Sequence, residues 1–363
     1  MTLPETVRVL FYATLLFVAS FDTVHAADGG RIRVAVSLGD SATLSADEAM
    51  EIVVGDRNET ARKVSLRLRG GEVFANDLRG KRVRVRTEAA FIDSGGTRLP
   101  GELTLTAGKE LLAVIEMSLE SYLVGVVSRE MAPSWPTEAL KAQAVLARTY
   151  AAHEMLQNAG KGYDLYADTR SQAFVWQTAR DPAVTAAVAE TEGWALEYNG
   201  SPIEAFFHAC SGGQTATAEE VWGKKLPYVS SVADPEARSI PECDWKYTVS
   251  PRDLGRAAGT GTVDTVEVVR RSRSGRADLL EIRGRTTRRV DGEKLRALLG
   301  YAKLKSTLFE VSESGGVFVF SGRGSGHGVG MSQRTAKWLA ERGIGWQEIL
   351  DRYYPTADLV PLH

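Results

Sequence analysis

Alternation of apolar and polar residues at every second position dominates the first third of the chain, after about residue 30. The clearest runs are residues 31–36, 64–68 and 82–86, and turns rich in glycine and aspartate separate them. This period predicts β-strands with one buried and one solvated face. In residues 82–86 the arginines share one face and the valines the other. The simplest interpretation is a solvated strand face, and a polyanion-binding stripe is the alternative.

The pattern changes to that of an α-helix after residue 118. Residues 119–130 place apolar side chains on one helical face, and Glu130 follows on the same face. Pro133 ends this helix. Thr137 is expected to be the N-cap of a second helix that runs to about Gln157. The alanines of this second helix favour close packing against a neighbour.

The remainder of the chain mixes short strands and helices. Strands are expected at 171–176 and 194–198, with a helix over 181–192 between them. Further on, hairpins turn at 274–275 and 314–316, and a helix covers 293–299. This order predicts an α+β fold with mixed sheets, a strand-rich N-terminal part and a central helical pair. We expect a signal peptide at 1–26, a strand-rich region at 27–112 and a catalytic region at 113–360.

The N-terminal segment has the layout of a secretory signal peptide. One cation, Arg8, precedes an uncharged apolar run over 9–19. Val24-His25-Ala26 then provides a cleavage site with residues of small or moderate size. The run is shorter than the roughly 18 residues that a membrane-spanning helix needs. An uncleaved membrane anchor is the alternative. The prediction is export to the periplasm or cell-wall space, with no integral membrane span after cleavage.

Composition excludes several classes of partner. The 363 residues include 44 Lys and Arg against 46 Asp and Glu, which gives a net charge of −2. Such a balance provides no general attraction to nucleic acid, so no nucleic-acid partner is predicted. Cys210 and Cys243 are the two cysteines. In an oxidising compartment a disulfide is their default state. Free thiols, a zinc site that includes His208, and a catalytic Cys210 with His327 as its base are the alternatives.

Two stretches carry candidate chemistry. Glu130 ends an apolar helical face, where desolvation raises the pKa of a carboxyl group toward that of a general acid; an ordinary surface helix end is the alternative. The second stretch, 322–330, has five glycines at alternate positions. If it is extended, the glycines clear one face and Arg323, Ser325, His327 and Val329 lie on the other. A flexible, tightly packed segment is the alternative interpretation of these glycines.

A set of motifs in a fixed order resembles the stage II sporulation protein D family (SpoIID/LytB domain proteins). The matching stretches are 121–131 (SYLVGVVSREM), 138–144 (EALKAQA), 147–151 (ARTYA), 211–215 (SGGQT), 226–228 (LPY), 326–333 (GHGVGMSQ), 348–350 (EIL) and 353–355 (YYP). Each motif alone is weak, but the combination is specific and covers residues 31 to 360.

The resemblance implies a cell-wall function. Sporulation-type members are lytic transglycosylases that cut peptidoglycan glycan strands, preferably strands stripped of stem peptides, and others are amidase enhancers. It implies Glu130, Arg148 and Tyr228 as catalytic residues. The predicted substrate-binding residues are Ser211, Gly212, Arg323, Ser325, His327 and Gln333. The predicted partners are peptidoglycan strands and a cell-wall amidase, and no cofactor or metal is expected.

The chain departs from the family pattern at two places. Residues 334–336 are Arg-Thr-Ala where the family has Gly-Ala, which would alter the rim of a groove. Ser171 stands where zinc-binding members carry cysteine, which lowers the case for zinc. For Arg148, the residues alone also permit a buried or rim ion pair. A non-catalytic peptidoglycan-binding amidase enhancer is the alternative function.

Overall fold

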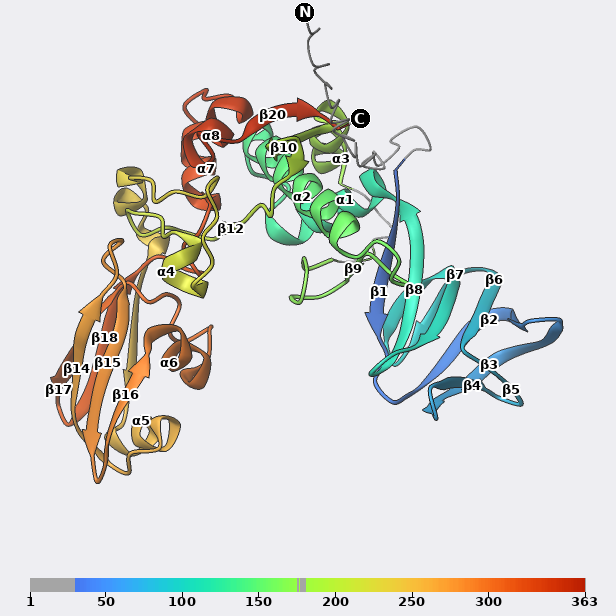
Figure 1. Cartoon of the computed structure of the whole chain (residues 1–363), viewed down its shortest axis with the longest axis horizontal. Helices are drawn as coiled ribbons and strands as arrows, with labels where there is room; N and C mark the ends of the chain where they lie inside the picture. Colours follow the sequence, from blue (N-terminus) through green and yellow to red (C-terminus); the bar gives the residue numbers. More distant parts are fainter. Residues whose placement is uncertain (1–29, 175, 177–180, 363) are drawn as a thin grey trace, which may run out of the picture.

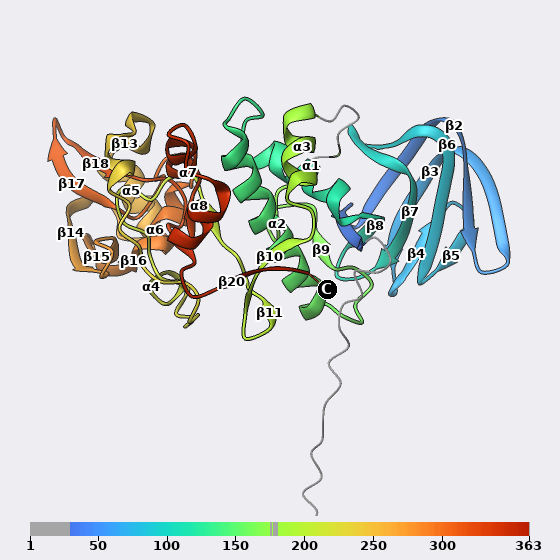
Figure 2. The same cartoon turned by 90° about the horizontal axis from the view of Figure 1, so that it is seen from above.

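The computed structural model describes residues 30–174, 176 and 181–362, and it has the α+β architecture predicted from the sequence (Figure 1). The predicted signal peptide, residues 1–26, lies outside the described residues. Figure 1 shows the chain as an arch, and in the view from above its parts lie in a row (Figure 2). A large N-terminal sheet stands at one end, helices form the middle, and a smaller mixed lobe stands at the other end.

The N-terminal sheet has nine strands in the order β5-β4-β3-β2-β6-β7-β8-β1-β9. The strands are β1 (Arg31–Ser37), β2 (Ser41–Val54), β3 (Arg57–Arg69), β4 (Glu72–Ala75), β5 (Leu78–Gly80), β6 (Arg82–Ser94), β7 (Thr97–Ala107), β8 (Leu111–Ser118) and β9 (Leu165–Tyr166). Val83 and Val85 of β6 are fully buried, whereas the arginines between and beside them are exposed. The predicted alternation in this strand is therefore confirmed. β8 continues to Ser118 and leads directly into the first helix.

Three helices form the middle of the arch: α1 (Leu119–Glu130), α2 (Thr137–Gln157) and α3 (Pro182–Glu190). The central helical pair is thus confirmed, and both α1 and α3 pack against α2. Pro136, not Thr137, occupies the N-cap position of α2, so that detail of the prediction is wrong. The backbone of Pro136 is extended, and the helix begins at Thr137.

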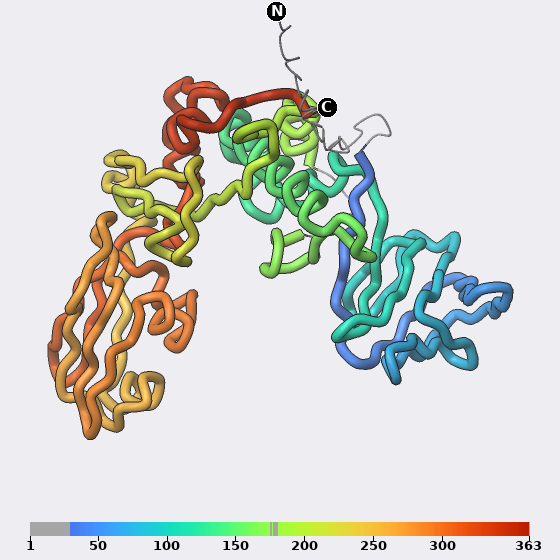
Figure 3. The backbone as a smooth tube through the Cα atoms, in the orientation of Figure 1, coloured from blue at the N-terminus to red at the C-terminus, as the bar shows by residue number. Residues whose placement is uncertain are grey.

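The strand expected at 171–176 is not formed at Ser171–Phe174 or at Trp176, which lie in irregular structure, and Val175 lies outside the described residues. The strand expected at 194–198 is confirmed as β10 (Trp194–Tyr198). It pairs with β11 (Ser201–Pro202) and with β20 (Asp358–Pro361). The C-terminal segment therefore runs back across the top of the arch to the central helices (Figure 3).

The second lobe has its own hydrophobic core and two three-stranded sheets. The strands are β13 (Asp244–Val249), β14 (Val263–Arg271), β15 (Ala277–Gly284), β16 (Thr287–Asp291), β17 (Phe309–Ser314) and β18 (Val317–Arg323), and the helices are α5 (Pro251–Ala258) and α6 (Gly292–Leu299). Both predicted hairpins are confirmed here, with their turns between β14 and β15 and between β17 and β18.

The remaining elements connect the lobe to the central helices. They are β12 (Phe207–His208), α4 (Ala218–Trp222), β19 (Met331–Ser332), α7 (Gln333–Ala340) and α8 (Trp346–Tyr353). β12 and β19 pair in parallel, and both α7 and α8 pack against α2. Across the ranges that the structure describes, no helix combines the length and apolar character needed to cross a membrane.

Candidate functional site

Glu130 lies where the central helices meet α7. It is the last residue of α1 and is half-buried. The amide nitrogen Nε2 of Gln333, at the start of α7, donates to Oε2 of Glu130 at 3.4 Å. The same nitrogen donates to Oε1 of Gln143 of α2 at 3.2 Å. Two predicted site residues that are 203 positions apart in the chain are therefore neighbours.

The environment of Glu130 favours the protonated carboxyl group. Burial raises its pKa above the ordinary value, while the hydrogen bond from Gln333 and the charge of Arg129 partly oppose this. Its position at the C-terminal end of α1 acts in the same direction as burial, because the negative end of the helix dipole disfavours a carboxylate. Among the described residues, no second carboxylate contributes to this shift.

Gln143 was missed by sequence reasoning. Its side chain is fully buried, and its Oε1 accepts the hydrogen bond that orients the Gln333 amide. Its own Nε2 is buried and has no hydrogen-bond partner within the described residues. Gln143 is a polar residue between the small apolar residues Ala142 and Ala144 of α2, and that contrast is the signal that could have identified it.

Arg148 lies in a different set of contacts. It is fully buried on α2, and its Nη2 and Nε bind the two carboxylate oxygens of Glu120 at 2.6 and 2.8 Å. Nη1 donates to the carbonyl of Trp194 and Nη2 also donates to that of Val188, each at 3.2 Å. Among the described residues these are its polar partners, and Glu130 is not one of them. The alternative interpretation of a buried ion pair is confirmed.

Tyr228 lies in a second polar cluster. Its hydroxyl accepts a hydrogen bond from the backbone N–H of Glu204 at 3.3 Å, and its ring packs on Tyr198 with the centroids 5.7 Å apart. The Glu204 carboxylate forms an ion pair with Lys224. Desolvation raises the pKa of the Tyr228 hydroxyl above its ordinary value, so it remains a neutral hydrogen-bonding group.

The glycine-rich segment does not continue as a strand, which corrects the prediction for 322–330. β18 ends at Arg323, and Gly324, Gly326, Gly328 and Gly330 all have positive φ. Glycine adopts this conformation readily, so the segment turns repeatedly instead of presenting one row of side chains. Arg323, Ser325, His327 and Val329 therefore do not share a face.

The glycines are needed because other backbone passes close to them. A Cβ atom at Gly324 would lie 2.9 Å from the carbonyl oxygen of Cys210, and one at Gly330 would lie 2.1 Å from that of Phe206. The tight-packing alternative is thus the one that the structure supports. It lets the 324–330 segment pack against the chain around β12.

His327 faces an aromatic cluster. Its ring centroid lies 5.1 Å from that of Trp222, 6.2 Å from that of Phe206 and 5.7 Å from that of His208. Desolvation lowers the pKa of His327 to about 4, so the ring is neutral near pH 7. Trp222 is 47% exposed although its ring packs on this cluster. Sequence reasoning missed Trp222 because it lies in a short helix that contains no recognisable sequence motif.

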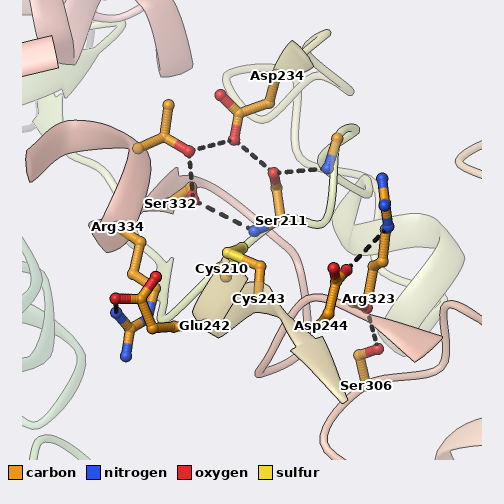
Figure 4. Close-up of a disulfide and its surroundings, with 12 residues drawn as sticks. Cys210, Ser211, Asp234, Glu242, Cys243, Asp244, Ser306, Arg323, Ser332 and Arg334 are labelled. Carbon is orange, nitrogen blue, oxygen red and sulfur yellow. Dashed lines mark hydrogen bonds and ion pairs between the residues drawn. A yellow bond between two sulfur atoms is a disulfide. The ribbon is translucent and has the colours of Figure 1, made fainter. Parts of the chain in front are cut away.

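Ser211 belongs to a buried polar network beside the disulfide (Figure 4). Its hydroxyl donates to Oδ2 of Asp234, which also accepts from Thr335 at 2.9 Å. Oδ1 of Asp234 accepts from the hydroxyl of Tyr353 at 3.0 Å and from Arg352 at 3.3 Å. Burial raises the pKa of Asp234, and these donors oppose the rise. The network joins the 211–215 loop to α7 and α8.

The other predicted binding residues lie near the disulfide, outside the contacts of Glu130. Arg323 is exposed and its Nε is 2.9 Å from Oδ1 of Asp244 (Figure 4). Ser325 exchanges backbone hydrogen bonds with Cys210. Gly212 has a φ of 78° and packs against the backbone of Arg323 and Gly324. Of the predicted site residues, the structure brings Glu130 and Gln333 into direct contact.

Cys210 and Cys243 form a disulfide, with their Cα atoms 5.9 Å apart (Figure 4). This excludes the alternatives of free thiols, of zinc bound through these cysteines and of a catalytic Cys210. Arg334, one of the residues that departs from the family pattern, lies beside it, with Nη1 3.9 Å from Glu242. Nowhere in the described ranges do three or more His, Cys, Asp or Glu side chains form a group that could hold a metal ion.

Removing the disulfide is expected to destabilise the fold. It closes a loop with a sequence separation of 33, and the loop-entropy relation gives about 4 kcal/mol of stabilisation for this length. The double variant Cys210→Ser/Cys243→Ser should therefore lower the free energy of unfolding by about that amount, as measured by urea denaturation. Reduced wild-type protein is the control and should behave like the variant. An unchanged urea midpoint would contradict the expectation.

Comparison with known proteins relates the chain to one family. A family model described as "Stage II sporulation protein" matches residues 107–198, and one for a domain of unknown function matches residues 247–330. An uncharacterized protein of Brachyspira hyodysenteriae is 31% identical, over 85% of this chain and 84% of its own length. Stage II sporulation protein D of Bacillus subtilis is 32% identical, over 67% of this chain and 74% of its own length.

A further relative carries a different name. The amidase enhancer of Bacillus subtilis is 29% identical over 65% of this chain, which corresponds to 40% of that longer protein. The range matched by the family model, residues 107–198, includes the helices α1 and α2. The chain is a member of the stage II sporulation protein D family.

Proposed function

We propose that this protein is a peptidoglycan lytic transglycosylase. It cleaves the bond from N-acetylmuramic acid to N-acetylglucosamine in glycan strands that lack stem peptides, and it leaves 1,6-anhydro ends. The observation that carries the proposal is the half-buried Glu130, whose pKa burial raises and whose carboxyl group accepts a hydrogen bond from Gln333; no carboxylate of the described residues contributes to that pKa shift. Family membership supports the class of substrate.

A single carboxyl group is sufficient for this reaction. Hydrolytic glycosidases generally use two carboxyl groups, one as acid and one as base or nucleophile. Here protonated Glu130 donates its proton to the glycosidic oxygen as the bond from that oxygen to C1 of the muramyl residue breaks. The resulting carboxylate then accepts the proton of the muramyl 6-hydroxyl, while the oxygen of that hydroxyl bonds to C1. Glu130 ends protonated, and no water is consumed.

The neighbouring residues have supporting roles in this proposal. The Gln333 amide orients the carboxyl group and stabilises its charged form between the two steps. Gln143 holds the Gln333 amide in place. The partly exposed Trp222 offers an apolar surface for a sugar ring, and the neutral ring of His327 lies 5.1 Å from it between centroids. Arg148 is assigned a structural role because its donors are engaged by Glu120 and two backbone carbonyls.

The pH dependence of cleavage tests the role of Gln333. Because catalysis starts from protonated Glu130, wild-type activity should fall as the pH rises through the pKa of that group. Gln333→Met removes a donor to the carboxylate, so the pKa of Glu130 should rise further and the alkaline limb should move up by about half to one pH unit. The measurement is a pH–rate profile, with Gln347→Met of α8 as the matched control. An alkaline limb that stays at the wild-type pH or moves to lower pH would contradict this role of Gln333.

The second candidate function is a non-catalytic regulator, and the relative named amidase enhancer favours it. The discriminating experiment incubates the purified protein with stripped and with intact strands and identifies the products by mass spectrometry. Anhydro-terminated fragments from stripped strands support the transglycosylase. Binding without new ends, together with faster release of stem peptides by an added cell-wall amidase, supports the regulator.

We further propose that the protein works outside the cytoplasm, in the periplasm or cell-wall space. The disulfide Cys210–Cys243 supports this location because disulfides persist in oxidising compartments. Peptidoglycan lies in the same compartment. The location is tested by fractionating cells that produce the protein and assaying its disulfide by thiol alkylation.

A further inference from the structure

A groove of about 760 Å³ lies on the exposed face of the N-terminal sheet, away from Glu130. Its floor is formed by strands β6, β7 and β8, and the 160–162 loop after α2 forms a wall. We call it the arginine groove. The residues used to define it are Arg33, Arg82, Arg84, Thr104, Thr106 and Lys161.

Most charges of the arginine groove have no carboxylate partner among the described residues. Arg82 and Arg84 are exposed, and within the same ranges neither side chain has an ion pair or a hydrogen-bond partner. Lys161 contacts the neutral amide oxygen of Asn158, not a carboxylate. Arg33, by contrast, is paired with Asp164 at 2.5 Å. Three cationic groups, Arg82, Arg84 and Lys161, therefore line the groove without an anionic partner in the described part of the chain.

Neutral hydroxyls lie directly beside the two free arginines. Arg82 is opposite Thr106 and Arg84 is opposite Thr104 in the pairing of β6 with β7. The arginines are two positions apart on one strand, so their side chains leave the same face about 7 Å apart. Each arginine and its threonine thus offer a guanidinium fork and a hydroxyl to an oxyanion.

Acidic residues limit the positive stretch along the strands. The next residue on this face of β6, Arg86, lies 3.8 Å from Glu51, and it is opposite Glu102 in β7. Glu116 of β8 also lines the groove. A polymer with closely spaced phosphates would be repelled by these carboxylates, whereas a ligand with one or two well-separated negative charges would not. The site therefore suits isolated carboxylates on a long neutral polymer.

We propose that the arginine groove is an accessory binding site for the carboxylates of a peptide-free glycan strand. This rests on the proposed function. A muramyl residue without its stem peptide exposes a free lactyl carboxylate, so a stripped strand carries one such charge in each disaccharide. The groove lies at the far end of α2 from Gln143, about 20 Å along that helix. A glycan strand longer than this separation is needed to occupy the groove and the Glu130 site together.

The test is a binding measurement with wild type and Arg82→Gln/Arg84→Gln, with Arg252→Gln/Arg273→Gln of the second lobe as the charge-matched control. The probes are stripped strands, the same strands with their carboxylates amidated, and poly(glycerol phosphate). We expect the groove variant to bind stripped strands about five- to tenfold more weakly. Amidated strands should bind wild type and the groove variant equally. Added salt should remove most of the difference.

The outcomes separate this proposal from the proposed function. Equal binding of stripped strands by wild type and the groove variant overturns the accessory site, whether or not the protein cleaves them. Arginine-dependent binding of poly(glycerol phosphate) that exceeds that of stripped strands overturns the carboxylate assignment. Loss of binding in the groove variant, in a protein that forms no anhydro ends, supports the site and rejects the transglycosylase.

Discussion

Glu130→Gln is expected to lower the rate of glycan cleavage by roughly 10³-fold, because general acid catalysis contributes on the order of 10² to 10⁴. Glutamine keeps the size of the side chain and its hydrogen bond with Gln333 but has no proton to transfer. The fold should be retained. The raised pKa means that folding favours the protonated group, so wild-type stability falls as pH rises through that pKa. Glutamine does not titrate, so the variant should be at least as stable near pH 7.

The measurement is the initial rate of release of anhydro-terminated fragments from stripped strands, together with the thermal midpoint. Glu313→Gln, an exposed residue of β17, is the matched control and should retain full activity. Retention of wild-type activity by Glu130→Gln would reject the assignment of the acid. If the variant loses activity because it unfolds, the prediction that the substitution leaves the fold intact is wrong.

Arg148→Met should lower the free energy of unfolding by about 3 to 5 kcal/mol. The substitution leaves the Glu120 carboxylate without its partner and leaves the carbonyls of Trp194 and Val188 without these donors. The loss is costly because Arg148 is fully buried, so the partly buried carboxylate and the two carbonyls lose their donors together. Urea denaturation measures this effect. Glu190→Gln, which removes an exposed partner of Lys141, is the control and should change stability by less than about 1 kcal/mol.

A kinetic measurement distinguishes this structural role from the catalytic role that the family resemblance implied. At a low temperature, where the variant is still folded, Arg148→Met should cleave stripped strands at a rate close to that of wild type. If the variant is folded and stable but inactive, Arg148 acts in the reaction and the structural assignment is wrong.

The central part of the fold follows from local patterns. The apolar face of α1 determines both the helix and the half-buried position of Glu130 at its end, and each depends on residues close together in the sequence. The contact between Glu130 and Gln333 depends on how α7 packs on α2, and no local sequence pattern predicts that packing. The family resemblance placed Gln333 near the site, but its atomic partner Gln143 required the packed structure.

Other features could not be predicted from the sequence, each for a specific physical reason. Alternating glycines imitate a strand in sequence, yet glycine also permits positive φ, and here the close approach of backbone from Phe206 and Cys210 selected the turns. Arg148 and Glu120 are 28 positions apart on different helices, so their pairing depends on how α1 packs against α2. Asp234 resembles an ordinary turn residue before proline, and its buried network is assembled from four distant segments.

The source of the oxygen at the new muramyl end tests the central claim most directly. Cleavage of stripped strands in water labelled with oxygen-18, followed by mass spectrometry, distinguishes internal ring closure from hydrolysis. If Glu130 acts alone as acid and then base, every new end is a 1,6-anhydro end and carries no label. Labelled reducing ends, formed at the rate of cleavage, would show that water attacks C1 and would contradict the single-carboxylate mechanism.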